Sequence, residues 1–155
     1  MTALAVDSVA PDFELPDQDG NVIKLSELTA QGPVVVFFYP KDDTPGCTKE
    51  ACEFRDRFKE FKDLGASVIG VSSDTVESHK KFEKKYSLTQ RMVSDADGKV
   101  RKAWGVPKKL FIDGRVTYLI DQERKVRFIH EEMMDGKIHT TKALEALKAL
   151  KGVTA

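Results

Sequence analysis

The sequence contains little cysteine: Cys47 and Cys52 are the only two thiols among its 155 residues. Two cysteines in a chain of this length do not make the disulfide framework of a small secreted domain. They also do not complete a four-ligand zinc site without help from the three histidines, which are scattered along the chain. We therefore predict neither a disulfide-stabilised scaffold nor a structural metal site.

The sequence also lacks an excess of charge of either sign and any long apolar run. Its 25 Lys and Arg residues balance 25 Asp and Glu residues, which argues against a general nucleic-acid or membrane-surface binder. No apolar run approaches the roughly 18 residues of a membrane-spanning helix.

Residues 1–10 lack the basic and apolar regions of a signal peptide. We expect a cytoplasmic protein, or an organellar one if a transit peptide has already been removed.

Length and hydrophobic pattern together predict one α/β domain over residues 1–155. Buried strands alternate with amphipathic helices, so we expect a central mixed sheet flanked by helices, preceded by an N-terminal hairpin. The expected strands are 13–15 and 22–24 in the hairpin, then 34–39, 67–71, 92–93, 115–120 and 126–130. The expected helices are 48–62, 75–86, a short one ending at residue 104, and 140–150, with an irregular loop at 108–114.

The stretch from Val34 to Lys62 holds both cysteines at a junction between a loop and a helix. Residues 34–39 are β-branched or aromatic, which is typical of a strand buried on both faces. Pro40 ends this strand, and a polar loop follows. Apolar side chains then recur at helical spacing: they are Phe54, Phe58 and Phe61.

Cys47 is expected to lie at the start of that helix, where unpaired backbone N–H groups stabilise negative charge. A free Cys has a pKa near ~8.5, so this position should favour the nucleophilic thiolate. Thr44 lies three residues earlier and could direct its hydroxyl at the sulfur or at a bound oxygen substrate. The alternative is that Cys47 is a small residue at a helix start with no chemistry.

Cys52 follows five residues later, and the helix geometry limits what it can do. On a regular helix, Cα atoms five positions apart are separated by roughly 8.6 Å, whereas disulfides need less than about 7 Å. A disulfide between Cys47 and Cys52 would therefore require the first turns of the helix to unwind. The alternative is that Cys52 is a small residue on the apolar face.

Outside this stretch, the polar side chains suggest little chemistry. We interpret His79 as part of a helix face, and His130 and His139 show no metal-ligand pairing with each other or with the cysteines. The lysines of the helix at 75–86 form a solvated face, or alternatively a surface for a partner. Trp104 is expected in the core.

The active-site pattern Pro40-x-x-x-Thr44-x-x-Cys47 resembles that of the peroxiredoxins. The run from Cys47 to Cys52, CTKEAC, is similar to the peroxiredoxin Q, or bacterioferritin comigratory protein, subfamily. The resemblance extends over nearly the whole chain, through the segments 10–13, 70–72, 104–106 and 115–121. It implies a thioredoxin-like fold and reduction of peroxides by a cysteine.

Peroxide reduction requires a poised nucleophile, donors for the oxygens and a cation for the developing charge. We assign Cys47 as nucleophile, with Thr44 and the backbone N–H groups near Gly46 and Cys47 holding the peroxide. An Arg is the best cation, because its charge does not titrate. Spacing does not choose among the arginines, but the resemblance selects Arg115. It also implies that Pro40 shields the thiolate, and Glu50 could orient the arginine or be an ordinary first-turn residue.

The resemblance further implies that Cys52 resolves a Cys47 sulfenic acid as an intramolecular disulfide, which thioredoxin or a similar dithiol reduces. Such a cycle makes a monomer feasible and calls for no metal, haem or flavin. Two other classes stay open from the residues alone. A general disulfide oxidoreductase would use Cys-x-x-Cys, which is absent. A metal carrier could use both sulfurs as soft ligands for Cu(I).

Overall fold

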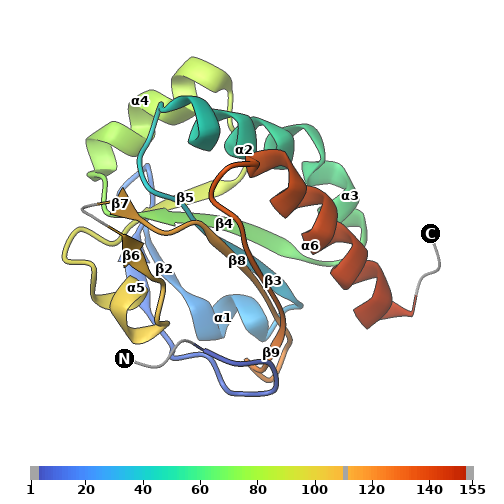
Figure 1. Ribbon diagram of the computed structural model, residues 1–155. Coiled ribbons are helices and arrows are strands. Elements are labelled where there is room, and N and C mark those ends of the chain that lie inside the picture. Colours follow the sequence, from blue (N-terminus) through green and yellow to red (C-terminus); the bar gives the residue numbers. More distant parts are fainter. Residues whose placement is uncertain (1–3, 110–111, 153–155) are drawn as a thin grey trace.

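The computed structural model describes residues 4–109 and 112–152 and contains a five-stranded mixed sheet (Figure 1). The strand order is β5-β4-β3-β8-β9. β3 runs parallel to β4 and antiparallel to β8, so it is the central strand. This arrangement confirms the predicted mixed sheet. The strands are β3 (Val34–Phe38), β4 (Ser67–Ser72), β5 (Arg91–Ser94), β8 (Val116–Ile120) and β9 (Val126–Glu131).

Helices cover both faces of this sheet, because the side chains of β3 alternate between two cores. Val35 and Phe37 face the core beneath α2, α3, α4 and α6, which lie together above the sheet in Figure 1. Val34, Val36 and Phe38 face the opposite core, which also contains Trp104. The helices are α1 (Leu25–Thr29), α2 (Pro45–Asp56), α3 (Phe58–Asp63), α4 (Val76–Tyr86), α5 (Lys99–Ala103) and α6 (Gly136–Lys151).

Two helices begin about one turn before their apolar pattern does. α2 starts at Pro45 rather than residue 48, because Pro is favoured in the first helical turn, where its missing N–H costs nothing. α6 starts at Gly136 rather than residue 140, because the Asp135 carboxylate accepts hydrogen bonds from the backbone of Lys137 and Ile138. The expected helix 48–62 is also two helices, separated at Arg57. These starts matter because both lie at the candidate site.

The smaller elements agree with expectation except in one loop. β1 (Glu14–Pro16) and β2 (Val22–Lys24) form the predicted hairpin. The expected irregular loop 108–114 instead contains a short antiparallel pair, β6 (Lys108–Lys109) with β7 (Ile112–Asp113). Residues 110–111 of that loop lie outside the described residues. No helix among the described residues is long and apolar enough to cross a membrane.

Candidate active site

Cys47 is the third residue of α2 and is almost completely buried. β3 ends at Phe38, and the loop 39–44 connects that strand to the helix. Thr44 is the N-cap residue, and its carbonyl accepts the first helical hydrogen bond from Thr48 N–H at 2.8 Å. The sulfur therefore belongs to a turn whose N–H groups have no helical carbonyl partner.

Arg115 reaches Cys47 across 68 positions of the sequence. It directly precedes β8, and the β3–β8 register pairs Phe38 with Val116, so the guanidinium lies beside the end of β3. Arg115 Nη2 donates to Cys47 Sγ at 3.4 Å, and Nε donates to the Met133 carbonyl at 3.2 Å. Burial alone would lower the pKa of Arg115, but Glu50 and Cys47 outweigh burial and raise it. The site therefore holds a fixed positive charge against the sulfur.

Glu50 completes this arrangement from one turn further along α2. Its Oε1 accepts from Arg115 Nη1 at 2.6 Å, and its side chain is fully buried. Burial raises the pKa of Glu50 to about 8, although the Arg115 charge acts in the opposite direction. Its second oxygen, Oε2, has no hydrogen-bond partner and lies 3.6 Å from His139 Nδ1. This carboxyl can therefore hold a proton at neutral pH.

His139 is a buried neighbour of the site that the sequence reasoning missed. Its Nε2 lies 2.7 Å from the Glu132 carbonyl, an acceptor, so Nε2 carries the proton; the Thr117 hydroxyl then donates to Nδ1 at 2.7 Å. Burial lowers the pKa of His139 to about 4, which keeps the ring neutral. The available signal was Asp135, whose capping position extends α6 back over His139.

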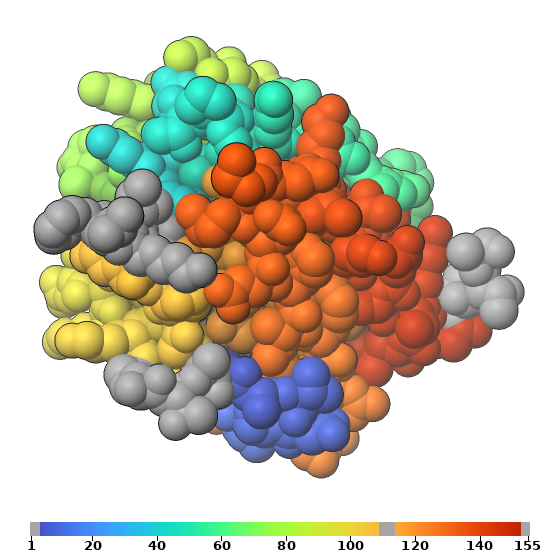
Figure 2. Space-filling model, in the orientation of Figure 1, coloured from blue at the N-terminus to red at the C-terminus, as the bar shows by residue number. Residues whose placement is uncertain are grey.

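The remaining expected residues line the same corner of the molecule. Thr44 is half-buried, and its hydroxyl donates to the Lys41 carbonyl at 2.9 Å. Pro40 is half-buried at the start of the loop. A Cβ on Gly46 would lie 3.0 Å from Arg115 Nη2, so the absence of a side chain there lets the guanidinium approach. Figure 2 shows the segment leading into α6, in orange, beside the cyan residues that begin α2.

Cys52 lies on the same helix as Cys47, and both thiols are free. It is half-buried, and burial raises the pKa of its thiol, an effect that Arg55 opposes. The two cysteines share an unbroken helix, so they have the spacing that prevents a disulfide without unwinding. Among the described residues, the cluster with the geometry for a metal ion is Asp42, Asp74 and His79, which contains neither sulfur.

The amino-acid sequence of this chain matches a known protein family. The sequence profile of the AhpC/TSA family matches residues 6–129. Peroxiredoxin Q, chloroplastic, from Oryza sativa subsp. japonica is 48% identical over 145 residues, which cover 92% of this chain and 66% of the rice protein. The chain therefore spans slightly less than two thirds of that relative.

Solved structures of related proteins are similar to this one over most of the chain. Peroxidoxin BcpB from Mycobacterium tuberculosis superposes with a TM-score of 0.89 at 42% identity, covering 94% of this chain and 97% of its own. The bacterioferritin comigratory protein of Xanthomonas campestris, solved in a study of its alkyl peroxide reduction activity, gives 0.82 at 32% identity, covering 90% and 92%. These neighbours confirm the expected thioredoxin-like fold.

Proposed function

This chain belongs to the AhpC/TSA family, in its peroxiredoxin Q branch, and on that premise we propose that it is a thiol peroxidase acting in antioxidant defence. Its substrates would be hydrogen peroxide and organic hydroperoxides. The observation that carries the proposal is the 3.4 Å contact between Cys47 Sγ and Arg115 Nη2 in the first turn of α2. A sulfur held between a helix N-terminus and a buried guanidinium is suited to react as a thiolate.

In the first step, the Cys47 thiolate attacks one peroxide oxygen and the O–O bond breaks. Cys47 becomes a sulfenic acid, and the other oxygen leaves as hydroxide or alkoxide and takes a proton to give water or an alcohol. Arg115 would stabilise the charge that develops on the oxygens, and the N–H groups of Gly46 and Cys47 would hold them in line. Glu50 supports this step by fixing the other arm of the Arg115 guanidinium.

Thr44 has a specific part in this step, which its hydrogen bond supports. Its hydroxyl hydrogen is committed to the Lys41 carbonyl, so Oγ1 presents lone pairs rather than a donor. Thr44 would therefore accept a hydrogen bond from the O–H of the bound peroxide. Pro40, which has no N–H, would shield the sulfur from water.

In the second step, the Cys52 thiolate attacks the sulfenic sulfur of Cys47, the S–O bond breaks, and hydroxide leaves and takes a proton to give water as the intramolecular disulfide forms. α2 would have to unwind for the sulfurs to meet. Thioredoxin or a similar dithiol would then reduce the disulfide by exchange, becoming oxidised itself. The cycle needs no second subunit and no metal, haem or flavin, so we propose a monomer. We place it in the cytoplasm, or in an organelle as for the chloroplastic rice relative.

The test is intact mass and free-thiol count after one equivalent of hydrogen peroxide. Wild type should lose two thiols and keep the mass of one chain. Cys52→Ser should gain oxygen on Cys47, whereas Cys47→Ser should react slowly. If Cys47→Ser consumed peroxide as fast as wild type, the assignment of the nucleophile would be wrong, and the metal or disulfide-exchange functions would be favoured instead.

A further inference from the structure

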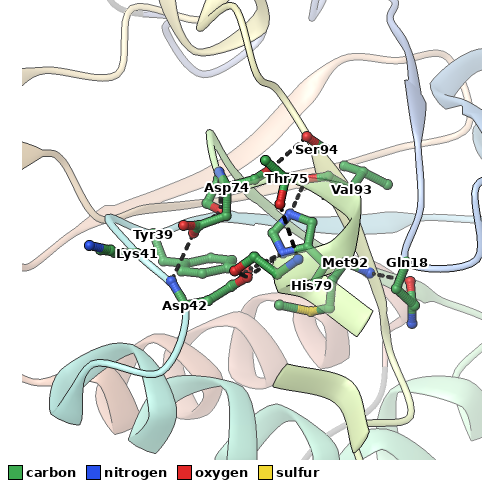
Figure 3. Close-up of polar contacts among 12 residues, drawn as sticks. Gln18, Tyr39, Lys41, Asp42, Asp74, Thr75, His79, Met92, Val93 and Ser94 are labelled. Carbon is green, nitrogen blue, oxygen red and sulfur yellow. Dashed lines mark hydrogen bonds and ion pairs between the residues drawn. The ribbon is translucent and has the colours of Figure 1, made fainter. Parts of the chain in front are cut away.

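A second buried polar cluster connects the loop that leads from β3 to Cys47 with α4 and β5 (Figure 3). Asp42, in this loop, has both carboxylate oxygens occupied by protein donors. Tyr39 donates to Oδ1 at 2.5 Å, and the Ser78 hydroxyl donates to Oδ2 at 2.8 Å. His79 Nδ1 also lies 2.8 Å from Oδ2. The helical pattern predicts that His79 is an ordinary residue of a helix face, but its side chain is completely buried.

The partners of the His79 ring determine how many protons the pair holds. Nε2 lies 3.0 Å from the Val93 carbonyl, which can only accept, so Nε2 carries a hydrogen. Nδ1 faces the Asp42 carboxylate, which as an ion also only accepts. Burial, and then the Asp42 charge, raise the pKa of Tyr39, so the Tyr39 hydroxyl keeps its own proton. The contact at 2.8 Å therefore requires one further proton, on Nδ1 or shared with Asp42, which makes the pair neutral overall.

The pair is bound to three parts of the fold. Ser78 and His79 come from α4, and the Val93 carbonyl comes from β5. The Asp42 backbone N–H donates to Asp74 Oδ2 at 2.8 Å, just after β4. Asp42 and Asp74 are the acidic groups next to His79, and with it they form the cluster that has metal-binding geometry. Both oxygens of Asp42 and both ring nitrogens of His79 have hydrogen-bond partners in the protein.

We propose that Asp42 and His79 act as a positioning pair for Cys47, a buried imidazolium–carboxylate contact that holds the loop before α2 against α4. The loop carries Pro40 and Thr44, and the Thr44 hydroxyl is in turn bonded to the carbonyl of Lys41, next to Asp42. A shift of this loop would move Thr44 and the first turn of α2 together. This inference rests on the proposed function of Cys47.

Asp43 provides a matched contrast in the same loop. It also bonds to α4, through Lys85 Nζ at 2.8 Å and the Tyr86 hydroxyl at 2.7 Å, but its side chain is exposed. Exposed ion pairs contribute little because water and salt screen them. Breaking a buried pair leaves one charge without compensation, which is far more costly. Substitution of Asp42 or His79 should therefore disturb the site, whereas substitution of Asp43 should not.

The first test is the protonation of the His79 ring at pH 7.5, measured by ¹H–¹⁵N correlation on histidine-labelled protein. Both ring nitrogens of His79 should carry hydrogen, whereas His139 should show a single protonated nitrogen, Nε2. Asp42→Asn keeps the contact by donating its amide to Nδ1, and should convert His79 to the neutral ring. A wild-type His79 with one protonated nitrogen would overturn the ion pair.

The second test is the second-order rate constant for Cys47 oxidation, followed by stopped flow. His79→Gln should lower it by about tenfold to 100-fold, because small displacements of reacting groups cost this much. Asp43→Asn should stay within about twofold of wild type. Ile120→Val loses a buried methylene from the other core. It is the control that shows how far reduced stability by itself lowers the rate constant.

The outcomes separate this proposal from the proposed function. If wild type reacts rapidly and His79→Gln matches Ile120→Val, the positioning role is wrong while the peroxidase function stands. If wild-type Cys47 itself reacts slowly, the peroxidase function fails and the positioning role fails with it. The ring-nitrogen measurement uses no peroxide, so it decides the ion pair in either case.

Discussion

At the scale of single residues, the buried carboxyl of Glu50 sets the charge balance of the site. Arg115 brings one positive charge, and a Cys47 thiolate would bring one negative charge. A second full negative charge, on Glu50, would leave these three buried side chains with an excess of negative charge. The pKa of about 8 fits this balance, since it leaves Glu50 mainly protonated at neutral pH.

This gives a prediction for the pH dependence of stability. The pKa of Glu50 is about 8 in the folded protein, against an ordinary value of 4.5. Between these values the folded state binds more protons than the unfolded state, so the contribution of Glu50 to stability falls as pH rises. Glu50→Gln removes this pH-dependent contribution. Its free energy of unfolding should therefore fall less than that of wild type between pH 5 and 8. Urea unfolding at pH 5, 6.5 and 8 measures the difference.

The control for this experiment is Glu53→Gln, a half-buried residue on the same helix. Its pH profile should run parallel to that of wild type. Parallel profiles for wild type and Glu50→Gln would contradict the raised pKa.

His139 acts in the opposite direction at lower pH. Its pKa is about 4 in the folded protein, against an ordinary value of 6.5, so its stabilising contribution is lost as pH falls from 6.5 through 4. Measurements at pH 6.5 and above avoid most of that effect.

At the scale of elements, the close contact of α2 with α6 determines which groups surround the sulfur. A Cβ on Gly136, the first residue of α6, would lie 2.7 Å from the Gly46 carbonyl oxygen and 2.9 Å from Glu50 Cβ. Both atoms belong to α2 and cannot move away as the end of a flexible side chain could. The residues before α6 supply the carbonyls of Glu132 and Met133, which bind His139 and Arg115.

Gly136→Ala should therefore separate the two helix starts. We expect it to lower the free energy of unfolding by about 1–3 kcal/mol, because overpacking outweighs the better helix propensity of Ala. It should also slow Cys47 oxidation by displacing the partners of Arg115. Urea unfolding and stopped-flow oxidation measure the two effects. Lys137→Ala, an exposed change in the same turn, should leave both unchanged; a Gly136→Ala protein equal to it would refute the close packing.

At the scale of the whole molecule, the proposed disulfide requires one helix to open while the rest of the fold persists. Cys47, Ala51 and Phe54 of α2 all belong to the core above the sheet. The same core also holds side chains from α3, α4 and α6, and the second core lies on the other side of the sheet. Opening of α2 therefore removes part of one core and leaves the other untouched.

Hydrogen–deuterium exchange of peroxide-oxidised wild type should accordingly show lost protection over residues 45–54. The strands β3, β4 and β8 should keep their protection, and so should α4, which contacts the loop 41–44. Cys52→Ser treated in the same way should retain protection in α2, since it cannot form the disulfide. Unchanged protection in fully oxidised wild type would mean that the two sulfurs meet without unwinding, contrary to the helix geometry.

The sequence by itself determined the features that depend on neighbouring residues. Strands such as β3 followed from a continuous β-branched and aromatic run, and the hairpin followed from its turn residues between short strands. Cys47, Thr44 and Pro40 lie within eight positions, so their common location between the end of one strand and the first turn of the next helix could be predicted from spacing. The unwinding needed for a bond to Cys52 followed from helix geometry alone.

Only the tertiary structure decided the contacts between distant segments. Spacing did not identify the arginine, which resemblance selected; the antiparallel β3–β8 register brings Arg115 to the sulfur. His79 meets Asp42 across 37 positions, and nothing in its helical pattern distinguishes a buried ion pair from a surface histidine. His139 reaches the site because a cap extends α6 beyond its apolar repeat. Hydrophobic periodicity reports which face of an element is buried, but strand order and register determine which buried groups meet.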